Sequence, residues 1–198
     1  MTHGDAAAAA RPPSVNDATQ PAAAGAAAPV GSLAGSASAH LAFIALGANL
    51  ANPLAQVRAA GKALAGLPAS RLLRLSSLYR TVPVGIRGQA DFVNAVAALE
   101  TALSPPRLLD ALFAIERRFG RRREYHHAPR TLDLDLLLYD EIVVDSQRLS
   151  VPHPRMHLRA FVLAPLLEIA PQVLIPGRGT AAAWLPAVSM QIIEKLGE

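Results

Sequence analysis

The stretch Leu41-Ala-Phe-Ile-Ala-Leu-Gly47 is a short apolar run that ends in glycine. A run of this length and composition is typical of a strand that is buried on both faces. A helix should follow it, because Asn52 can cap a helix, Pro53 suits its first turn and Gly66 can end it. The segment therefore predicts the first strand of a sheet, followed closely by a helix.

The remaining elements complete an α+β pattern. They are two strands at 71–80 and 92–100, a helix from Ser104 to Gly120, a strand at 132–139, a hairpin-like segment up to Val151 and a helix at 156–170. The order β-α-β-β-α-β-α is the ferredoxin-like arrangement, a four-stranded antiparallel sheet with helices packed on one face. We expect Pro165 to kink the last helix. The loop at 81–90 is long for a hairpin, which indicates a function beyond connection.

Composition divides the chain into three parts. Residues 1–40 are rich in alanine, proline and glycine and hold no aromatic residue, so we expect a disordered tail. Residues 41–178 should form one domain, and no role is assigned to the extension at 179–198.

The chain holds no cysteine, which excludes disulfides and thiolate metal sites and suits a reducing cytoplasm. No apolar run approaches the roughly 18 residues of a membrane span, so we expect a cytoplasmic protein.

Positive charge is concentrated in one segment. The formal net charge is +4, and six arginines between Arg117 and Arg130 are opposed by a single acid, Glu124. Such a segment indicates a polyanionic partner, which could be nucleotide phosphates or a nucleic-acid backbone. Composition alone does not separate these two partners.

Two carboxylates follow this segment. Asp133 and Asp135 stand two residues apart in the strand expected at 132–139, so they should project from one face. Mg²⁺ typically takes one or two protein carboxylates and completes its shell with water and substrate phosphates. The pair alone would also fit the solvated face of an amphipathic strand. Arg130 and the arginines at 121–123 favour a polyphosphate site, because such sites combine metal with guanidinium groups.

Five segments, taken in order, resemble the hydroxymethyl-dihydropterin pyrophosphokinase family over residues 41–175. They are Ala45–Leu50, Ser76–Thr81 with Pro83 and Gly85, Asp91–Ala95, Ala128–Asp135 and Val151–His153. The resemblance implies an ATP-dependent enzyme of folate biosynthesis. Such an enzyme transfers pyrophosphate from ATP to 6-hydroxymethyl-7,8-dihydropterin and releases AMP.

The resemblance also implies roles for individual residues. Asp133 and Asp135 would be catalytic and would bind two Mg²⁺ ions, with Arg121 and Arg130 as further catalytic residues. The ATP site would comprise Glu116, Arg121, Arg123, Arg130, Ser150, His153 and Arg159. The pterin site would comprise Thr81, Val84, Phe92, Asn94 and Phe161, with the ring between the two phenylalanines. The loops at 81–90 and 121–128 would close over bound ATP. The chain departs from many relatives at His127 and from some at Pro154 and near Phe113, so the resemblance does not settle which aromatic contact would close them.

Two other classes of protein share this element order. RRM modules that bind RNA are also β-α-β-β-α-β, and the arginines could follow a phosphate backbone. However, no segment shows the aromatic RNP1 pattern, and the aspartate pair would repel a backbone. A regulatory domain that binds a ligand without turnover would leave the pairing of acids and arginines without a purpose. We therefore expect ATP and the pterin as small-molecule partners of a monomer, with no nucleic acid and no membrane.

Overall fold

The computed structural model describes residues 39–82, 90–120 and 131–197, which belong to one compact unit of the chain. The tail expected at 1–40 lies outside the described residues except for its last two. Of these, His40 already begins the first strand. None of the described helices is both long and apolar enough to cross a membrane.

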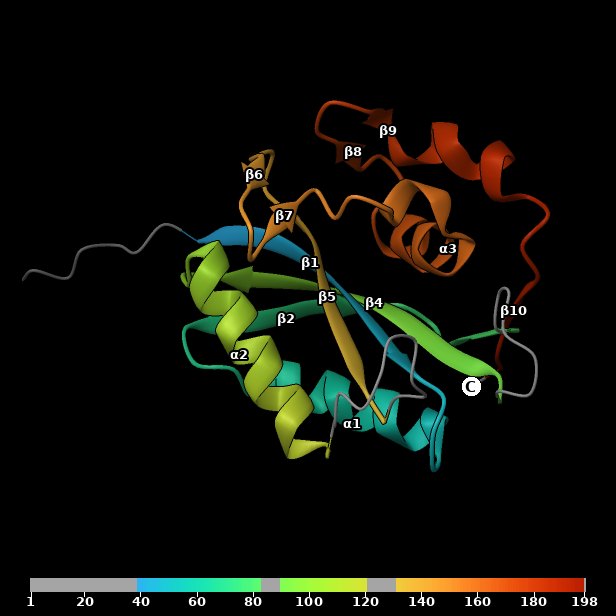
Figure 1. The fold of residues 1–198 in the computed structure, drawn as a ribbon, viewed down its shortest axis with the longest axis horizontal. Helices are drawn as coiled ribbons and strands as arrows, with labels where there is room; N and C mark the ends of the chain where they lie inside the picture. The colour runs from blue at the N-terminus through green and yellow to red at the C-terminus, as the bar shows by residue number, and fades with distance from the viewer. Residues whose placement is uncertain (1–38, 83–89, 121–130, 198) are drawn as a thin grey trace, which may run out of the picture. The chain divides into compact units, whose positions relative to one another are not determined.

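Within the described residues, six strands form one antiparallel sheet (Figure 1). They are β1 (His40–Ala48), β2 (Ser70–Leu75), β3 (Tyr79–Thr81), β4 (Phe92–Thr101), β5 (Asp133–Tyr139) and β10 (Ile193–Lys195). The order is β10-β3-β4-β1-β5, and β2 pairs with the far end of β4. The apolar run that opens the domain is thus the central strand β1, between β4 and β5.

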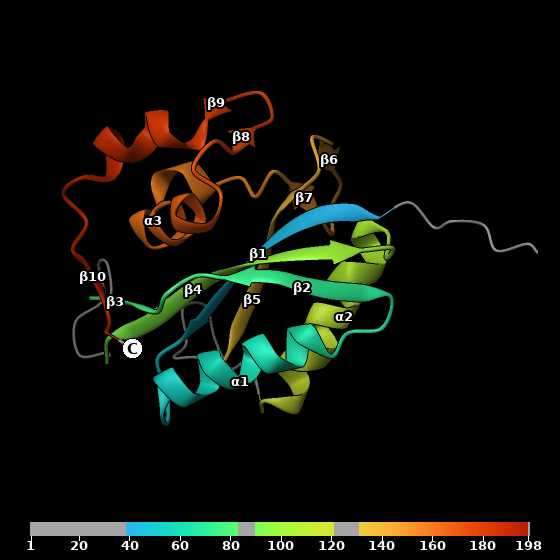
Figure 2. The ribbon, with the colours of Figure 1, turned by 180° about the vertical axis from the view of Figure 1, so that it is seen from behind.

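Helices cover both faces of this sheet (Figures 1 and 2). One face packs against α1 (Pro53–Ala65) and α2 (Pro105–Arg118), and the other against α3 (Ala160–Ile169) and the 3₁₀ helix η2 (Ala181–Val188). The α+β class and the ferredoxin-like order are confirmed, but the expectation of helices on one face is wrong. The reason is that α3 is apolar on nearly all sides, and it buries its side chains on the face that α1 and α2 leave uncovered.

Short elements connect these layers. They are the pair β6 (Val144–Asp145) and β7 (Ser150–Val151), the pair β8 (Leu174–Ile175) and β9 (Gly179–Thr180), and the 3₁₀ helix η1 (Met156–Leu158). The β6–β7 pair is the hairpin-like segment expected from the sequence.

Local signals place both early helices where the sequence predicts them. The Asn52 side chain accepts a hydrogen bond from the Ala55 amide at 3.1 Å, and α1 stops before Gly66. On α2, Leu108, Leu112 and Ile115 are buried along one stripe. Gly120 follows this helix with a φ of 74°, a left-handed conformation that glycine adopts without strain.

Two predicted elements are each split in two. The strand expected at 71–80 breaks between β2 and β3, because the Ser77 amide donates to Glu168 instead of to a neighbouring strand. The helix expected at 156–170 is divided at Arg159, whose backbone is extended, into η1 and α3. The interruption therefore lies at Arg159, while Pro165 stays inside α3.

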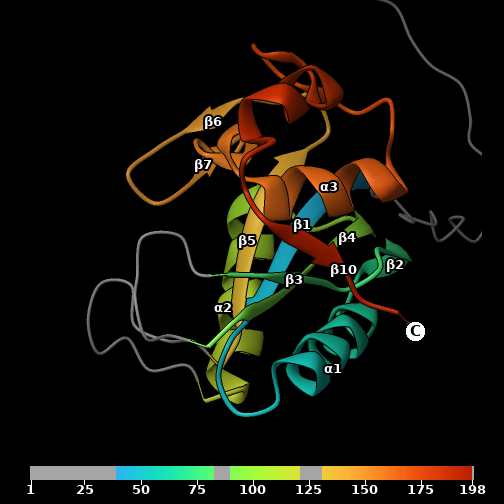
Figure 3. The same cartoon turned by 90° about the vertical axis from the view of Figure 1, so that its right-hand side faces the viewer.

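The segment at 179–198, left without a role by the sequence, contributes to both the core and the sheet. Its helix η2 packs on α3, and β10 pairs with β3 at the sheet edge (Figure 3). Trp184 packs edge-on against the ring of His157, with 4.5 Å between the ring centroids. It also donates from Nε1 to the carbonyl of Arg178 at 3.1 Å.

His157 should make the stability of the fold depend on pH. It is buried, and its Nδ1 has no hydrogen-bond partner among the described residues. Burial and then the nearby Arg178 lower its pKa from the ordinary 6.5, so the folded state favours the neutral ring. The unfolded chain therefore binds the proton more readily, and the free energy of unfolding should fall as the pH drops below about 6.5.

The check is urea unfolding between pH 7.5 and 5 for the wild-type protein and the variant His157→Phe. The variant keeps an aromatic ring beside Trp184 but cannot titrate there, so it should lose less stability on acidification. Contributions from other groups are common to both proteins and cancel in the comparison. Equal losses in the two proteins would show that His157 is not the group responsible.

Candidate active site

The three central strands bring the predicted pterin and metal residues into one row. In the sheet register Gly47 of β1 pairs with Asn94 of β4 on one side and with Asp133 of β5 on the other. Directly opposed residues project to the same face. That face is the one covered by α3, because Val96, two residues beyond Asn94, belongs to the core against α3. Asn94 and Asp133 therefore flank Gly47 on the face of the sheet that α3 covers.

Gly47 allows this close approach. A methyl group at this position would come within 3.1 Å of Asn94 Oδ1, which is tighter than an ordinary contact. The Asn94 amide also donates from Nδ2 to Thr81 Oγ1 at 2.9 Å, and both residues are buried. Thr81 lies opposite Phe92 in the pairing of β3 with β4. Three of the five predicted pterin residues are thus neighbours at one end of the sheet.

The two aspartates alternate along β5 as the sequence predicts. Asp133 and Asp135 pair with Gly47 and Ala45 of β1, so both side chains project toward the α3 side, and both are partly exposed. Leu134 between them is buried on the opposite face. The backbone amide of Leu134 donates to Oε1 of the buried Glu116 at 2.8 Å. Glu116, predicted to support the ATP site, thus holds the backbone between the two acids.

Two residues from other elements approach Asp135. Its Oδ2 lies 3.8 Å from Arg159 Nη1 and 3.9 Å from His153 Nε2. The position of His153 is set by β5, since its amide donates to the carbonyl of Leu137 at 2.8 Å. Leu137 lies where the β1–β5 register shifts, an irregularity of the kind often found beside functional sites.

His153 is a neutral hydrogen-bond donor at neutral pH. Burial, followed by the charges of Arg159 and Arg155, lowers its pKa to about 4. The Arg155 amide lies 3.2 Å from His153 Nδ1 and donates to it, which leaves the ring proton on Nε2. Nε2 is the atom that faces Asp135, so the positive charge beside this carboxylate comes from Arg159.

Arg159 connects the predicted ATP residues to the predicted pterin residues. Its guanidinium carbon lies 5.5 Å from the centre of the Phe161 ring, within the range of a cation–π contact. Arg159 is the extended residue between η1 and α3, and Phe161 lies in the first turn of α3. The interruption between η1 and α3 therefore presents both the Arg159 and the Phe161 side chains to the site.

Comparisons with known proteins identify the family. The model for 7,8-dihydro-6-hydroxymethylpterin-pyrophosphokinase (HPPK) matches residues 43–171. The chain belongs to the HPPK family. A Pseudomonas aeruginosa protein named 2-amino-4-hydroxy-6-hydroxymethyldihydropteridine pyrophosphokinase is 48% identical over 78% of this chain and 95% of its own. A Haemophilus influenzae protein of the same name is 48% identical over 68% of this chain and 84% of its own.

Solved structures agree on the fold. The chain is similar to HPPK-DHPS of Plasmodium falciparum with a TM-score of 0.60 and 12% sequence identity. The alignment covers 75% of this chain and 43% of that protein. At this level of identity the similarity shows the HPPK fold alone.

Several residues predicted for this HPPK site are not placed together with the others. Val84, Arg121, Arg123, Arg130 and also His127 lie outside the described residues. Ser150 is described, and its hydroxyl contacts Asp145 Oδ1 at 3.3 Å within the β6–β7 pair. The two phenylalanines, in contrast, lie beside other predicted residues, since Phe92 is opposite Thr81 and Phe161 is beside Arg159.

The sequence interpretation gave no individual role to two residues beside the candidate site, although both lie in the segment Ala45–Leu50 that carries the resemblance. Gly47 was expected to end a strand, and its missing side chain also makes room for the Asn94 amide. Asn49 is also buried, and its Nδ2 donates to the carbonyl of Ala90 at 3.4 Å, which ties the end of β1 to the residues before Asp91. A polar amide directly after an apolar strand was the available signal for Asn49.

The donor set suits magnesium. In the part of the chain that the structure describes, no three His, Asp or Glu side chains gather as a closed metal site. Asp133 and Asp135 instead offer carboxylate oxygens on one face of β5, with partial exposure to solvent. Mg²⁺ commonly uses one or two such carboxylates and takes its other ligands from water and substrate phosphates.

Proposed function

We propose that the row of residues around Gly47 carries out the reaction of the HPPK family in this chain. The chain is a pyrophosphokinase that transfers pyrophosphate from ATP, its co-substrate, to 6-hydroxymethyl-7,8-dihydropterin in folate biosynthesis. The observation that carries the site assignment is the placement of Asn94 and Asp133 on either side of Gly47. This arrangement would bring a heterocycle and a polyphosphate together at one end of the sheet.

The reaction is a displacement at the β-phosphorus of ATP. The hydroxymethyl oxygen of the pterin forms a bond to this phosphorus and releases its proton. The bond from the β-phosphorus to the α–β bridging oxygen breaks, and AMP leaves with the electron pair. Negative charge therefore grows on the bridging oxygen, and groups that meet this charge lower the barrier.

Asp133 and Asp135 would hold two magnesium ions against the phosphates. Bound there, magnesium would neutralise phosphate charge and polarise the bond that breaks. The carboxylates would fix the phosphates relative to β5, and Glu116 would keep the intervening backbone in place through its contact with the Leu134 amide.

The cationic and hydrogen-bonding contacts to ATP would come from several segments. Arg159 supplies a fixed positive charge near Asp135, whereas the neutral His153 would donate a hydrogen bond from Nε2 to a phosphate oxygen. We also assign Arg121 and Arg130 to catalysis and Arg123 and Ser150 to ATP binding, because the resemblance of the sequence motifs to the HPPK family implies these roles.

The pterin would lie at the β4 side of the row. Phe92 and Phe161 would stack on its two faces, and Arg159 would orient Phe161 through their cation–π contact. Asn94 would hydrogen-bond to the polar edge of the ring, and the Thr81 hydroxyl would orient the Asn94 side chain by accepting a hydrogen bond from its amide. Backbone groups around Val84 would add hydrogen bonds.

We further assign residues 41–178 to the pyrophosphokinase activity of a cytoplasmic monomer that binds no nucleic acid, with η2 and β10 of the C-terminal extension completing the core and the sheet of the same domain. The absence of cysteine supports the location, and small-molecule substrates account for the arginines without a nucleic-acid partner.

The test of the function is product analysis. Pure protein with ATP, Mg²⁺ and 6-hydroxymethyl-7,8-dihydropterin should yield AMP and the pterin diphosphate in equal amounts. A reaction without the pterin should give almost no AMP, because transfer requires the acceptor hydroxyl. ADP as the product would contradict pyrophosphoryl transfer.

A further inference from the structure

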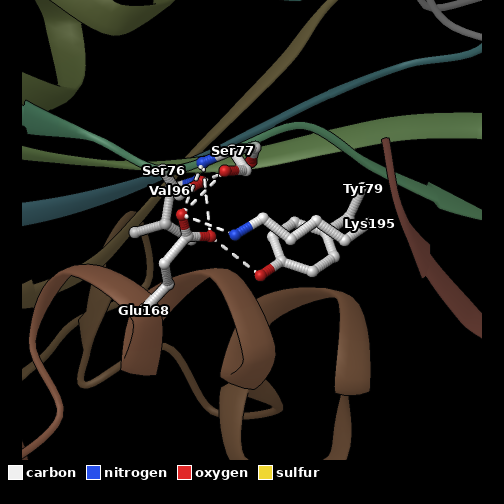
Figure 4. A network of polar contacts seen from close by, with 6 residues as sticks. All are labelled: Ser76, Ser77, Tyr79, Val96, Glu168 and Lys195. Carbon is white, nitrogen blue, oxygen red and sulfur yellow. Dashed lines mark hydrogen bonds and ion pairs between the residues drawn. The ribbon is translucent and has the colours of Figure 1, made fainter. Parts of the chain in front are cut away.

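A carboxylate outside the site joins three elements of the fold. Glu168 of α3 accepts hydrogen bonds from the Ser77 hydroxyl at 2.7 Å, the Ser77 amide at 3.2 Å and the Tyr79 hydroxyl at 2.8 Å. Lys195 of β10 adds a contact from Nζ at 3.3 Å. Figure 4 shows the Glu168 side chain rising from α3 toward the break between β2 and β3.

The charge states of this cluster are fixed at neutral pH. Burial opposes ionisation of Glu168, but the hydrogen bonds from Ser77, Tyr79 and Lys195 outweigh it and lower its pKa. Burial, together with Glu168, raises the pKa of Tyr79 to about 12. Glu168 therefore remains an acceptor and Tyr79 a donor over the whole physiological range.

The cluster lies in the same row of the sheet as the site. Lys195 pairs with Tyr79, and Tyr79 pairs with Asn94, which in turn pairs with Gly47 and so reaches Asp133. One row of directly paired residues thus runs across five strands, from Lys195 on the C-terminal strand to the proposed metal ligand Asp133.

The strand between cluster and site is too short to hold itself in place. β3 has three residues, and its pairing carries Thr81 to the side chain of Asn94. On the other side it has β10, with the Leu196 amide donating to the Leu78 carbonyl at 2.8 Å. A strand of three residues makes few ladder bonds, so its position depends on the contacts that flank it.

We propose that Glu168 is a positioning residue for the pterin side of the site, acting with Lys195 on the C-terminal strand. By anchoring Ser77 and Tyr79, Glu168 fixes β3 on α3 and so sets the place of Thr81, which holds the Asn94 amide. The inference rests on the proposed role of Asn94 in pterin binding. Neither Glu168 nor Lys195 contacts the substrates in this scheme.

The first test is steady-state kinetics of Glu168→Gln. Glutamine keeps the size of the side chain, but its NH₂ group cannot accept a hydrogen bond, so Ser77 or Tyr79 loses its acceptor. We expect KM for the pterin to rise by about tenfold, the equivalent of one hydrogen bond to a charged group, with KM for ATP and kcat within about twofold of wild type. A rise of both KM values to the same extent, in step with a lower Tm, would reduce Glu168 to a structural role and overturn the proposal.

The second test uses two neighbours on β10 as a matched pair. Lys195→Met removes the contact with Glu168, whereas Glu194→Gln removes the contact of Glu194 with Arg80 at 3.6 Å. The two positions alternate on β10 and both side chains are largely exposed, at 56% and 63%. Lys195→Met should raise KM for the pterin, by less than Glu168→Gln does, and Glu194→Gln should leave every constant unchanged.

The outcomes separate the inference from the function on which it rests. If wild-type protein makes no AMP, the proposed function fails. If wild-type protein makes AMP while Glu168→Gln and Lys195→Met both keep the wild-type KM for the pterin, only the positioning role is wrong. An equal effect of Lys195→Met and Glu194→Gln on KM for the pterin would also overturn the positioning role, because Lys195 contacts Glu168 whereas Glu194 contacts Arg80.

Discussion

Replacing Asp133 or Asp135 by asparagine should reduce AMP production by about a hundredfold or more, the scale on which single electrostatic contacts to a transition state act. Each substitution keeps the size of the side chain and removes the charge that would hold magnesium on β5. The measurement is AMP formation at saturating Mg²⁺ for each single variant. Near-normal turnover by either variant would contradict the proposed role of the pair.

Stability should not follow this loss of activity. The two carboxylates project from the same face, and without metal their like charges repel, so neutralising Asp133 should leave the apo protein as stable or slightly more stable. Asp135 also attracts Arg159, with 3.8 Å between the charged atoms. The loss of this attraction offsets the relief of repulsion, so substitution of Asp135 should change the free energy of unfolding by no more than about 0.5 kcal/mol. Melting temperatures without metal test both statements.

A suitable control is Asp110→Asn. Asp110 lies on α2, is exposed and pairs with Arg148 on the surface. Its neutralisation removes one carboxylate and one ion pair without touching β5, so AMP production should remain at the wild-type level. A comparable loss of activity in this control would mean that net charge, and not the position of the aspartates, explains the effect.

Replacing Asn94 by alanine should weaken pterin binding by about a hundredfold and change ATP binding by less than twofold. The substitution removes the group proposed to read the edge of the ring, and a lost hydrogen bond in a buried site costs roughly 1–3 kcal/mol. Titration of each ligand separately gives the two dissociation constants. Equal losses for ATP and pterin would point to a general defect of folding.

Thr81→Val separates the two contacts of Asn94. This variant removes the Thr81 hydroxyl, which accepts from Asn94 Nδ2 at 2.9 Å, but leaves the Asn94 side chain itself. It should weaken pterin binding less than Asn94→Ala does, because the amide still reaches the ring with a less fixed orientation. An effect as large as that of Asn94→Ala would assign the loss to the Thr81–Asn94 pair.

The elements predicted correctly from the sequence are those specified by neighbouring residues. The ends of α1 are set by local capping at Asn52, Pro53 and Gly66. The two-residue spacing of Asp133 and Asp135 places both side chains on one face, because side chains in a strand alternate. The five motif segments supply the family, since their order along the chain is itself a signal. These features require no knowledge of distant contacts.

The features that could not be predicted depend on distant contacts. The break between β2 and β3 arises because the Ser77 amide turns to Glu168, a residue 91 positions away. The neutral state of His153 depends on burial and on Arg159 and Arg155 around it. The row Asn94, Gly47, Asp133 depends on the register of three strands, which no single segment specifies.

The pairing of β10 with β3 also affects the order in which the fold can be completed. A chain is synthesised from its N-terminus, so β3 and β4 leave the ribosome before residues 193–195 exist. Until then the outer edge of β3 has no partner strand, and an unpaired edge is a template for association with other chains. The part of the sheet that carries Thr81 is therefore the last to be protected during synthesis, although it lies near the beginning of the domain.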